Sequence, residues 1–486
     1  MTLNELLESI YIGEIEERFK QTKILSVCCD SRKVMMGGLF VALKGRAYDG
    51  TDFVEAAITK GAYAVATMGD IQQLQKKHEH VCFLKVDNLQ EFLQGAVYKL
   101  FGDPSDEVKT IGVTGTNGKT TVAYFIETIF NEAGAECGVV GTINYRLADN
   151  IIPAKQTTPS FIDNQHFLTG LAWQSIPYCV IEVSSHALMQ GRVHGINFKG
   201  AVFTNLTSDH LDYHKTAENY FLAKSRLFTG LVSQATAVIN TDDPYGCRLL
   251  TMTSAKIITY GIERQADVMG KDIQLDIQGN RFTLVCAAGE IEIQTQFFGM
   301  YNIYNILAAA AVCMAEGLDL NVIKKGIERL GVVPGRLERV ECGQDFPVFI
   351  DYAHTQDALE NVLAAIRQVS KKRIILAFGC GGDRDKSKRP LMGRVASRLA
   401  DYSIVTSDNP RNEDPQSIID QIIPGFDKDN YKVVVNREEA IEEALKDAKV
   451  GDIVLIAGKG HEMVQVLADG PVDFNEREII EKFLKC

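Results

Sequence analysis

The chain has 486 residues, of which 46% are hydrophobic and 23% are charged. This length and composition are typical of a globular protein of about three domains with large cores. The 63 acidic residues outnumber the 51 basic ones, which gives a formal net charge of −12. Such a charge argues against non-specific binding to nucleic acid or to an anionic membrane surface, and we expect no nucleic-acid partner. The net charge does not exclude binding of small anionic ligands, because such ligands need only a local basic pocket.

The 11 cysteines are scattered along the chain, and no Cys-x-x-Cys pair occurs. An odd number of this kind favours reduced thiols in a cytoplasmic protein over a disulfide framework. The first 25 residues are acidic, unlike a signal peptide, and no apolar run approaches membrane-spanning length. We therefore expect a cytoplasmic protein that does not insert into a membrane.

Apolar, strand-like runs alternate with helical patterns over most of the chain, which predicts α/β sheets. The clearest helix covers residues 119–133. Val122 and Phe125 lie on its apolar face, and Gly134 ends the pattern. We find no internal repeat. The runs expected as strands are 108–113, 178–183, 201–205, 236–240, 348–352, 373–379, 402–406 and 452–457.

Two turn-rich segments mark candidate domain boundaries, one at 102–105 and one at 333–335. We expect a leading domain at 1–105, a central nucleotide-binding domain at 106–334 and a trailing α/β domain at 335–486. Active sites of such chains usually lie in the clefts between domains.

Residues 112–121 read Gly-Val-Thr-Gly-Thr-Asn-Gly-Lys-Thr-Thr, between an apolar run and an amphipathic stretch. This context predicts a loop that binds the phosphates of a nucleoside triphosphate, although its spacing departs from the common Walker pattern. Gly115 and Gly118 would let backbone N–H groups face the phosphates at the positive end of a helix dipole. Lys119 would neutralise phosphate charge, and Thr120 would hold Mg²⁺. The alternative is an ordinary strand-to-helix turn.

Three polar features follow in the central region. Glu182 ends an apolar strand, where ligands of parallel sheets bind, and is a candidate Mg²⁺ ligand. His210 and His214 have a spacing found in zinc sites, but they lack the glutamate of a zincin, and the alternative for His210 is a solvated loop side chain. Lys224 lies among apolar neighbours in a helical stretch, where a surface or snorkelling lysine is the default interpretation.

Four polar, glycine-rich segments follow four strands of the trailing domain, so we expect them to meet at one rim of an open sheet. Arginines in these segments could clamp carboxylates bidentately, and carboxylates could receive an ammonium group. This mixture suits a zwitterionic ligand. The segments cover 351–354, 379–386, 407–411 and 458–462.

A set of distinctive motifs runs from end to end of the chain. These are Asp-Ser-Arg at 30–32, Gly-Gly-Leu-Phe-Val-Ala at 37–42, the loop at 112–121, Thr-Thr-Pro at 157–159, Glu-Val-Ser-Ser-His-Ala-Leu-Met-Gln-Gly-Arg at 182–192, Asp-His-Leu-Asp-Tyr-His at 209–214, Asn-x-x-Asn at 302–305, Pro-Gly-Arg at 334–336 and the four trailing segments. On these motifs, the chain resembles the Mur ligase family.

The resemblance implies a three-domain α/β architecture, with a central P-loop domain and a Rossmann-like C-terminal domain. It also implies ATP-dependent amide formation in peptidoglycan synthesis. The D-glutamate γ-carboxylate of UDP-N-acetylmuramoyl-L-alanyl-D-glutamate would take the γ-phosphoryl group to form an acyl phosphate, and an amine would then displace phosphate. Activation of this kind is needed because a carboxylate is a poor electrophile, and a cation can stabilise the spreading phosphate charge.

By the same resemblance, Thr120 and Glu182 would bind one Mg²⁺, and His210 with Lys224 a second. Lys224 would be carbamylated, which overturns the default interpretation of a surface lysine. The implied catalytic residues are Lys119, Glu182, His210, Lys224 and Arg336. The implied ATP-binding residues are Gly115, Thr116, Asn117, Gly118, Lys119, Thr120, Thr121, Asn302, Asn305, Arg336 and Asp351.

The other implied substrate sites hold the UDP-sugar peptide and the incoming amino acid. Arg46 departs from the histidine that some family members have, which affects the local uridine contact. The implied UDP-substrate residues are Ser31, Thr157, Thr158, Ser184, Gln190 and Arg192. The implied amino-acid-binding residues are Arg384, Asp408, Asn409, Pro410, Arg411, Gly458 and Glu462.

The Asp-Asn-Pro-Arg segment at 408–411 accompanies family members that add meso-diaminopimelate. Arg411 and Arg384 can pair with the second carboxylate of that substrate, which lysine lacks, so we expect diaminopimelate to be preferred by several kcal/mol, on the order of a broken buried charge pair. The alternatives are a ligase that adds L-lysine, a non-catalytic binder of the UDP-sugar peptide, a folylpolyglutamate synthase and a generic P-loop ATPase. We expect a monomer with these small molecules as its partners.

Overall fold

The computed structural model describes residues 1–45, 48–207 and 209–485. Arg46, the position at which the chain departs from some family members, lies outside the described residues. The chain forms two compact units. The first unit combines Met1–Val108 with Ser160–Ser175 and Arg192–Asn197, and the second unit contains the remainder. The first unit therefore includes a helical segment from beyond the boundary expected near residue 105. The three domain ranges stay predictions.

The first unit is built on a four-stranded parallel sheet in the order β1-β2-β3-β4. Alternate residues of each strand point to opposite faces, so Leu39 and Val41 enter one core and Phe40 enters the other. The strands are Ser26–Cys28, Gly38–Val41, Ala62–Thr67 and Cys82–Lys85. The helices are α1 (Leu3–Leu7), α2 (Glu17–Lys20), α3 (Val54–Thr59), α4 (Gln72–Lys77), α5 (Leu89–Phe101) and α7 (Phe161–Trp173).

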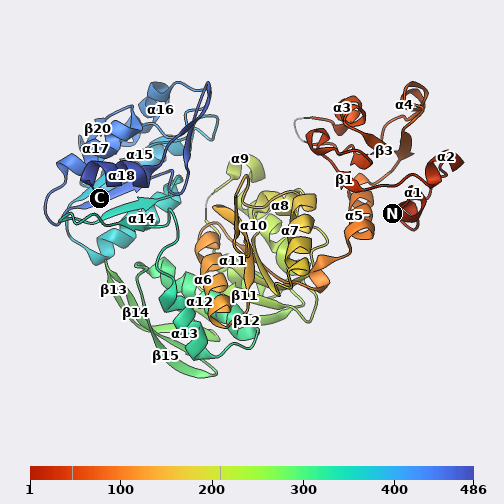
Figure 1. Cartoon of the computed structure of the whole chain (residues 1–486). Helices are drawn as coiled ribbons and strands as arrows, with labels where there is room; N and C mark the ends of the chain where they lie inside the picture. The colour runs from red at the N-terminus through yellow and green to blue at the C-terminus, as the bar shows by residue number, and fades with distance from the viewer. Residues whose placement is uncertain (46–47, 208, 486) are drawn as a thin grey trace. The chain divides into compact units, whose positions relative to one another are not determined.

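The second unit contains two separate large sheets (Figure 1). The larger has eleven strands in the order β15-β14-β13-β12-β11-β10-β5-β9-β6-β7-β8. Its central strands are parallel, and β5 (Lys109–Thr114) lies between β10 (Phe198–Phe203) and β9 (Tyr178–Glu182). The segments that follow these three strands therefore emerge at one edge, where ligands of such sheets bind.

Helix α6 (Lys119–Glu132) follows β5 and packs its apolar face into the central core, where Val122, Phe125 and Ile129 are fully buried. This agrees with the helix expected at 119–133. The other strands of this sheet are β6 (Cys137–Val140), β7 (Asn144–Leu147), β8 (Asn150–Pro153), β11 (Thr236–Asn240), β12 (Lys256–Gly261), β13 (Val268–Asp276), β14 (Gly279–Cys286) and β15 (Gly289–Thr295). The other helices are α8 (Ser185–Met189), α9 (Leu211–His214), α10 (Ala217–Thr229), α11 (Pro244–Leu249), α12 (Met300–Ala315) and α13 (Leu320–Arg329).

The second large sheet has six strands in the order β16-β17-β21-β18-β19-β20. Only β16 runs antiparallel, at the edge. Strands β18 and β21 are buried at every position, as expected for parallel strands covered by helices on both faces. The strands are β16 (Glu338–Val340), β17 (Val348–Asp351), β18 (Ile374–Phe378), β19 (Tyr402–Val405), β20 (Tyr431–Val433) and β21 (Ile453–Ala457), and a separate hairpin joins β22 (Val464–Leu467) to β23 (Gly470–Asp473). The helices are α14 (Gln356–Val369), α15 (Lys388–Leu399), α16 (Pro415–Ile422), α17 (Arg437–Asp447) and α18 (Glu476–Leu484).

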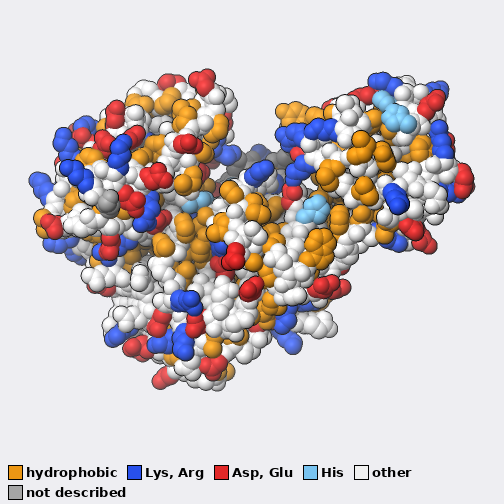
Figure 2. All heavy atoms as spheres, in the orientation of Figure 1, with side chains coloured by type: hydrophobic (Ala, Val, Ile, Leu, Met, Phe, Trp, Pro, Cys, Tyr) orange, Lys and Arg blue, Asp and Glu red, His pale blue; other side chains and the backbone are white. Residues whose placement is uncertain are grey.

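Figure 2 shows acidic and basic side chains interspersed over the visible face. Among the described residues, nine cysteines are free thiols. Cys342 is disulfide-bonded, which differs from the expectation of reduced thiols at that position. None of the helices within the described residues combines the length and the apolarity that crossing a membrane requires.

Candidate functional site

The loop between β5 and α6 is shaped by two glycines. Gly118 has a φ of +88° and immediately precedes the first residue of α6. A Cβ atom at Gly118 would collide with Asn305 Oδ1, and one at Gly115 would collide with Thr204 Oγ1. Glycine is therefore required at both positions by the close approach of neighbouring side chains, and the first-turn N–H groups of α6 remain available to an anion.

Two lysines meet the backbone of this loop. Lys119 Nζ donates to the carbonyls of Gly115 and Thr116 at 3.0 and 2.8 Å. Lys224 Nζ donates to the same Gly115 carbonyl at 2.7 Å and is fully buried. Burial lowers the pKa of Lys119 and lowers the pKa of Lys224 well below its usual value. The default interpretation of Lys224 as a surface lysine is therefore wrong.

Glu182 gathers hydroxyl groups at the end of β9. Its buried carboxylate accepts hydrogen bonds from Thr120 Oγ1 at 3.0 Å and from Thr142 Oγ1 at 2.8 Å. The backbone N–H of Thr142 also donates to it at 2.9 Å. Thr142 was not singled out from the sequence, although its position just after β6 was the available signal.

The segment that enters the six-stranded sheet also contacts Thr120. Arg336 Nη2 donates to Thr120 Oγ1 at 3.1 Å, and its guanidinium lies 4.8 Å from the ring of Tyr352. Asp351 accepts backbone N–H groups from Leu337 and Ala353 at 2.7 and 2.8 Å. Burial raises the pKa of Asp351, against the opposing effect of Arg336. Asp351 thereby fixes the backbone next to Arg336.

Two asparagines of α12 line the other side of the loop. Asn302 Nδ2 donates to the carbonyl of Phe298 at 2.9 Å, and Asn305 Nδ2 donates to Asn302 Oδ1 at 3.1 Å. Loop residue Asn117 donates from Nδ2 to Asp357 Oδ2 at 2.7 Å, a contact that the sequence did not suggest. Thr116 and Thr121 are buried within the loop and the first turn of α6.

His210 and Lys224 both border Tyr220. The ring centroids of His210 and Tyr220 are 6.1 Å apart, and Lys224 Nζ lies 4.6 Å from the Tyr220 ring. His210 also makes an edge contact with His186, whose ring centroid is 4.9 Å away. The His210 side chain is 44% exposed, so it is accessible from solvent.

The donor set at Thr120 and Glu182 fits a magnesium ion. Both residues present oxygen atoms, which a hard cation prefers, and Mg²⁺ usually takes only one or two protein carboxylates and keeps waters or substrate phosphates as its other ligands. Across the described ranges, no group of three or more His, Cys, Asp or Glu side chains is placed to hold a metal ion. A magnesium site here would therefore depend on the nucleotide for further ligands.

The four polar segments of the trailing region lie at one edge of the six-stranded sheet. Their strands β17, β21, β18 and β19 are neighbours and run parallel, so their carboxyl ends point the same way. Buried Lys459, which sequence reasoning had not singled out, joins two of these segments. Its Nζ donates to Asn409 Oδ1 at 2.9 Å and to Glu462 Oε2 at 2.8 Å.

Asp408 places a carboxylate oxygen at this rim. Oδ1 accepts the backbone N–H of Asn409 at 2.6 Å, while buried Oδ2 has no hydrogen-bond partner among the described residues and faces Gly458. Burial opposes ionisation of this carboxyl, but Arg437 and Lys459 bring its pKa below the usual value. The result is a desolvated anion with one vacant acceptor atom, which suits an ammonium group.

The two predicted arginines of the rim differ in their setting. Arg411 has a φ of +53°, and its Nη1 donates to the carbonyls of Gly382 and Asn409 at 2.8 and 3.3 Å. A positive φ at a residue other than glycine stores strain and is often found at functional sites. Arg384 is exposed on the neighbouring segment. Pro410 is buried between Asn409 and Arg411.

The residues expected to bind the UDP-sugar peptide are divided between the two units. Ser31 and Arg192 belong to the first unit, and Asn164 Nδ2 donates to the Arg192 carbonyl at 3.0 Å. The other four belong to the second unit: Thr157, Thr158, Ser184 and Gln190. Thr158 Oγ1 donates to the Glu182 carbonyl at 2.6 Å and accepts the Ser184 N–H at 3.0 Å, so these residues adjoin the Glu182 site.

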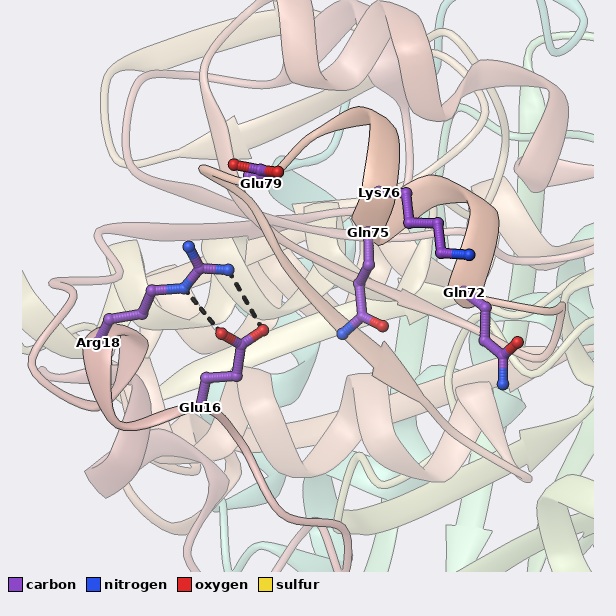
Figure 3. A pocket seen from close by; sticks show the side chains of 6 residues that line it. All are labelled: Glu16, Arg18, Gln72, Gln75, Lys76 and Glu79. Carbon is purple, nitrogen blue, oxygen red and sulfur yellow. Dashed lines mark hydrogen bonds and ion pairs between the residues drawn. The ribbon is translucent and has the colours of Figure 1, made fainter.

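A separate depression in the first unit contains none of the predicted residues. It has a volume of about 550 Å³, and a Glu16–Arg18 ion pair lies at one side (Figure 3). Its remaining lining side chains are polar, and none of them was predicted from the sequence to belong to a functional site. They are Gln72, Gln75, Lys76 and Glu79.

Comparison with known proteins now defines the class. Family models match the Mur ligase middle domain at residues 113–313, the glutamate ligase domain of Mur ligases at 335–460 and the Mur ligase family catalytic domain at 23–97. The chain belongs to the Mur ligase family.

Relatives of known name match this chain over at least 93% of both lengths. The UDP-N-acetylmuramoyl-L-alanyl-D-glutamate--2,6-diaminopimelate ligase of Clostridium tetani is 41% identical, over 100% of this chain and 99% of that protein. The protein of the same name from Geobacter metallireducens is 43% identical, over 94% and 93%. A solved structure of a ligase of this name is 32% identical, covers 100% of this chain and 99% of its own, and has a TM-score of 0.69.

Proposed function

We propose that the protein is an ATP-dependent ligase that joins meso-diaminopimelate to the D-glutamate γ-carboxylate of UDP-N-acetylmuramoyl-L-alanyl-D-glutamate. The observation that carries this proposal is the double engagement of Thr120, whose hydroxyl is hydrogen-bonded to Glu182 and to Arg336. A carboxylate and a guanidinium thus meet at Thr120, in the first turn of the phosphate-loop helix α6. This arrangement supports phosphoryl transfer, in which metal-binding oxygens and a cation stabilise the charge of the transferred group. The names of the full-length relatives support the choice of substrates.

The chain's own groups would act in two steps. The phosphate loop and Lys119 hold the β- and γ-phosphates, and Arg336 stabilises negative charge as the γ-phosphoryl group moves to the D-glutamate carboxylate. Mg²⁺ held by Thr120 and Glu182 would supply further charge neutralisation when bound. In the second step the amine attacks the acyl carbon, a C–N bond forms, the C–O bond to phosphate breaks, and the amine proton is released. Asn302, Asn305 and Asp351 complete the proposed ATP site.

The carbamate proposed on Lys224 from the family resemblance is supported by the burial of this amine. Burial lowers the pKa of Lys224 well below its usual value, which favours the neutral amine. A neutral amine can add carbon dioxide, forming an N–C bond and releasing a proton. The product is an anionic group beside the Gly115 carbonyl and near His210, where it could share the second magnesium ion.

The choice of diaminopimelate rests on the rim of the six-stranded sheet. The vacant Oδ2 of Asp408 and the carboxylate of Glu462 suit an ammonium group. Arg411 and Arg384 suit the distal carboxylate, which lysine lacks. The cytoplasmic location and the monomeric state expected from the sequence belong to the same proposal.

The deciding experiment measures phosphate release with ATP, Mg²⁺ and UDP-N-acetylmuramoyl-L-alanyl-D-glutamate, with meso-diaminopimelate in one sample and L-lysine in another. The product mass is recorded in both. Turnover with diaminopimelate alone supports the whole proposal. Turnover with lysine keeps the ligase and rejects the specificity, whereas silence with both amines rejects the ligase in favour of a non-catalytic binder or a folylpolyglutamate-type enzyme.

A further inference from the structure

The loop at residues 407–413 carries the predicted amine-binding residues Asp408 and Arg411 but contains no helix or strand of its own. It follows β19 and precedes α16. Arg411 within it adopts a positive φ. A loop with a strained residue keeps one conformation only when its surroundings determine it. Two fully buried arginines that belong to neither the loop nor the predicted site supply those surroundings.

Arg437, the first residue of α17, holds the beginning of the loop. Its Nη1 donates to the Ser407 carbonyl at 3.1 Å, and its Nη2 donates to the Ala457 carbonyl at 2.8 Å. Nε and Nη2 also donate to Glu476 Oε1 at 2.8 and 2.6 Å. One guanidinium therefore joins the start of the loop to the end of β21, directly before Gly458, while Glu476 balances its charge.

Arg389, on α15, holds the end of the loop. Its Nη1 and Nη2 donate to Glu413 Oε2 and Oε1 at 3.0 and 2.9 Å, and Nη2 also donates to the Gly381 carbonyl at 3.2 Å. Glu413 Oε1 accepts the backbone N–H of Asp383 at 2.7 Å. This bidentate pair therefore ties the loop to the segment that carries Arg384.

We propose that Arg389 and Arg437 are positioning residues for recognition of the incoming amino acid, because they clamp both ends of the 407–413 loop. The proposal rests on the proposed function. Buried ion pairs are weak evidence for stability, since apolar replacements of similar volume are often as stable. Their use here is geometric, because the two guanidinium forks hold three segments together. They engage both ends of the 407–413 loop, at Ser407 and Glu413, the end of β21 at Ala457, and the segment that carries Arg384 at Gly381.

The test compares three variants of the full chain. Glu413→Gln removes one charge from the Arg389 pair without leaving a cavity, and Arg437→Lys keeps a cation but lacks the fork that reaches Ser407 and Ala457. Asp401→Asn is the matched control. Its carboxylate also accepts from an arginine, Arg367, and from a backbone N–H, that of Ile374, but it does not contact the loop.

The expected result is a rise of about tenfold in KM for diaminopimelate in Glu413→Gln and Arg437→Lys, with a reduced preference over L-lysine and with the KM values for ATP and the UDP-substrate within about twofold. Asp401→Asn should keep all three KM values. If Arg437→Lys fails to fold, Glu413→Gln decides alone. Unchanged amine KM values, or equal losses for every substrate, overturn the positioning role while the ligase stands. A wild type silent with both amines rejects the proposed function and this proposal with it.

Discussion

Arg336 donates a hydrogen bond to the hydroxyl of Thr120 across 216 residues of chain, and the same hydroxyl donates to Glu182. One small side chain therefore connects the phosphate-loop helix, the end of β9 and the segment that enters the six-stranded sheet. Two of the predicted catalytic residues, Glu182 and Arg336, are in this way joined through Thr120, which was predicted to bind ATP and Mg²⁺.

This coupling predicts a selective effect of Thr120→Val, which keeps the side-chain shape and removes the hydroxyl. We expect kcat for phosphate release to fall by about a hundredfold or more, because the proposed magnesium ligand and the contact to Arg336 would be lost together. Thr128→Val is the control, since Thr128 lies on the same helix and, among the residues that the structure describes, its hydroxyl donates only to the Tyr124 carbonyl. Similar losses in both variants would contradict the role of Thr120.

Much of the fold could be predicted from local pattern, because apolar runs and helical periodicity report directly on burial. The expected helix at 119–133 is observed at Lys119–Glu132, and each expected strand has a counterpart. One run was displaced at both ends: the run expected at 201–205 corresponds to β10 at Phe198–Phe203. Strand ends depend on pairing with neighbours, here β5 and β11, which a single run of sequence does not contain.

The site could be predicted less well from the sequence where distant segments bury a charged residue. Lys224 and Lys459 each satisfy their ammonium groups with partners from other loops. Arg389 and Arg437 lie in helices whose sequence alone suggests solvated side chains. Local hydropathy cannot distinguish these cases, since the compensating carbonyls and carboxylates come from elsewhere in the chain.

The Arg411 side chain is predicted to control the choice of amine. In Arg411→Ala we expect kcat/KM for meso-diaminopimelate to fall by about a hundredfold, because the distal carboxylate would lose its partner, while the value for L-lysine changes little or rises. Arg394→Ala, an exposed arginine of α15, serves as the control. The measurement is paired kinetics with the two amines. An unchanged ratio of the two kcat/KM values would refute the assignment.

The close approach of the Asn305 side chain to Gly118 predicts that adding one methyl group at Gly118 weakens nucleotide binding. Gly118→Ala must place a Cβ against Asn305 Oδ1 and must also keep a φ of +88°. Gly134→Ala carries a comparable backbone cost at +75° but meets nothing within 4 Å. Both variants should lose about 1 kcal/mol of stability from the backbone term, and only Gly118→Ala should lose nucleotide affinity, by about tenfold or more. Calorimetric titration with ADP separates them, and equal affinities would contradict the contact.

Lys224 should carry a carbamate that depends on dissolved carbon dioxide. We expect activity to fall when the protein is held at mildly acidic pH in CO₂-free buffer, because a carbamate is lost on protonation, and to return when bicarbonate is added. A ¹³C-bicarbonate sample should give a carbamate resonance that is absent from Lys224→Arg, which keeps a cation but cannot form the group. Full activity of Lys224→Ala together with no response to bicarbonate would refute the modification.

The ion pair of Glu413 with Arg389 predicts a specific acid sensitivity. The hydrogen bond from Arg389 is the main cause that lowers the pKa of Glu413 from 4.5 to about 2. Because the folded-state pKa is the lower one, the unfolded chain binds more protons between these values, so the stabilising contribution is complete above pH 4.5 and is lost as the pH falls towards 2. The difference in Tm between the wild type and Glu413→Gln should therefore be constant above about pH 5 and should shrink below it. Asp401→Asn gives the comparison for an ion pair that does not contact the 407–413 loop. A Tm difference for Glu413→Gln that stays constant down to pH 2.5 would show that the ionised pair does not stabilise this loop.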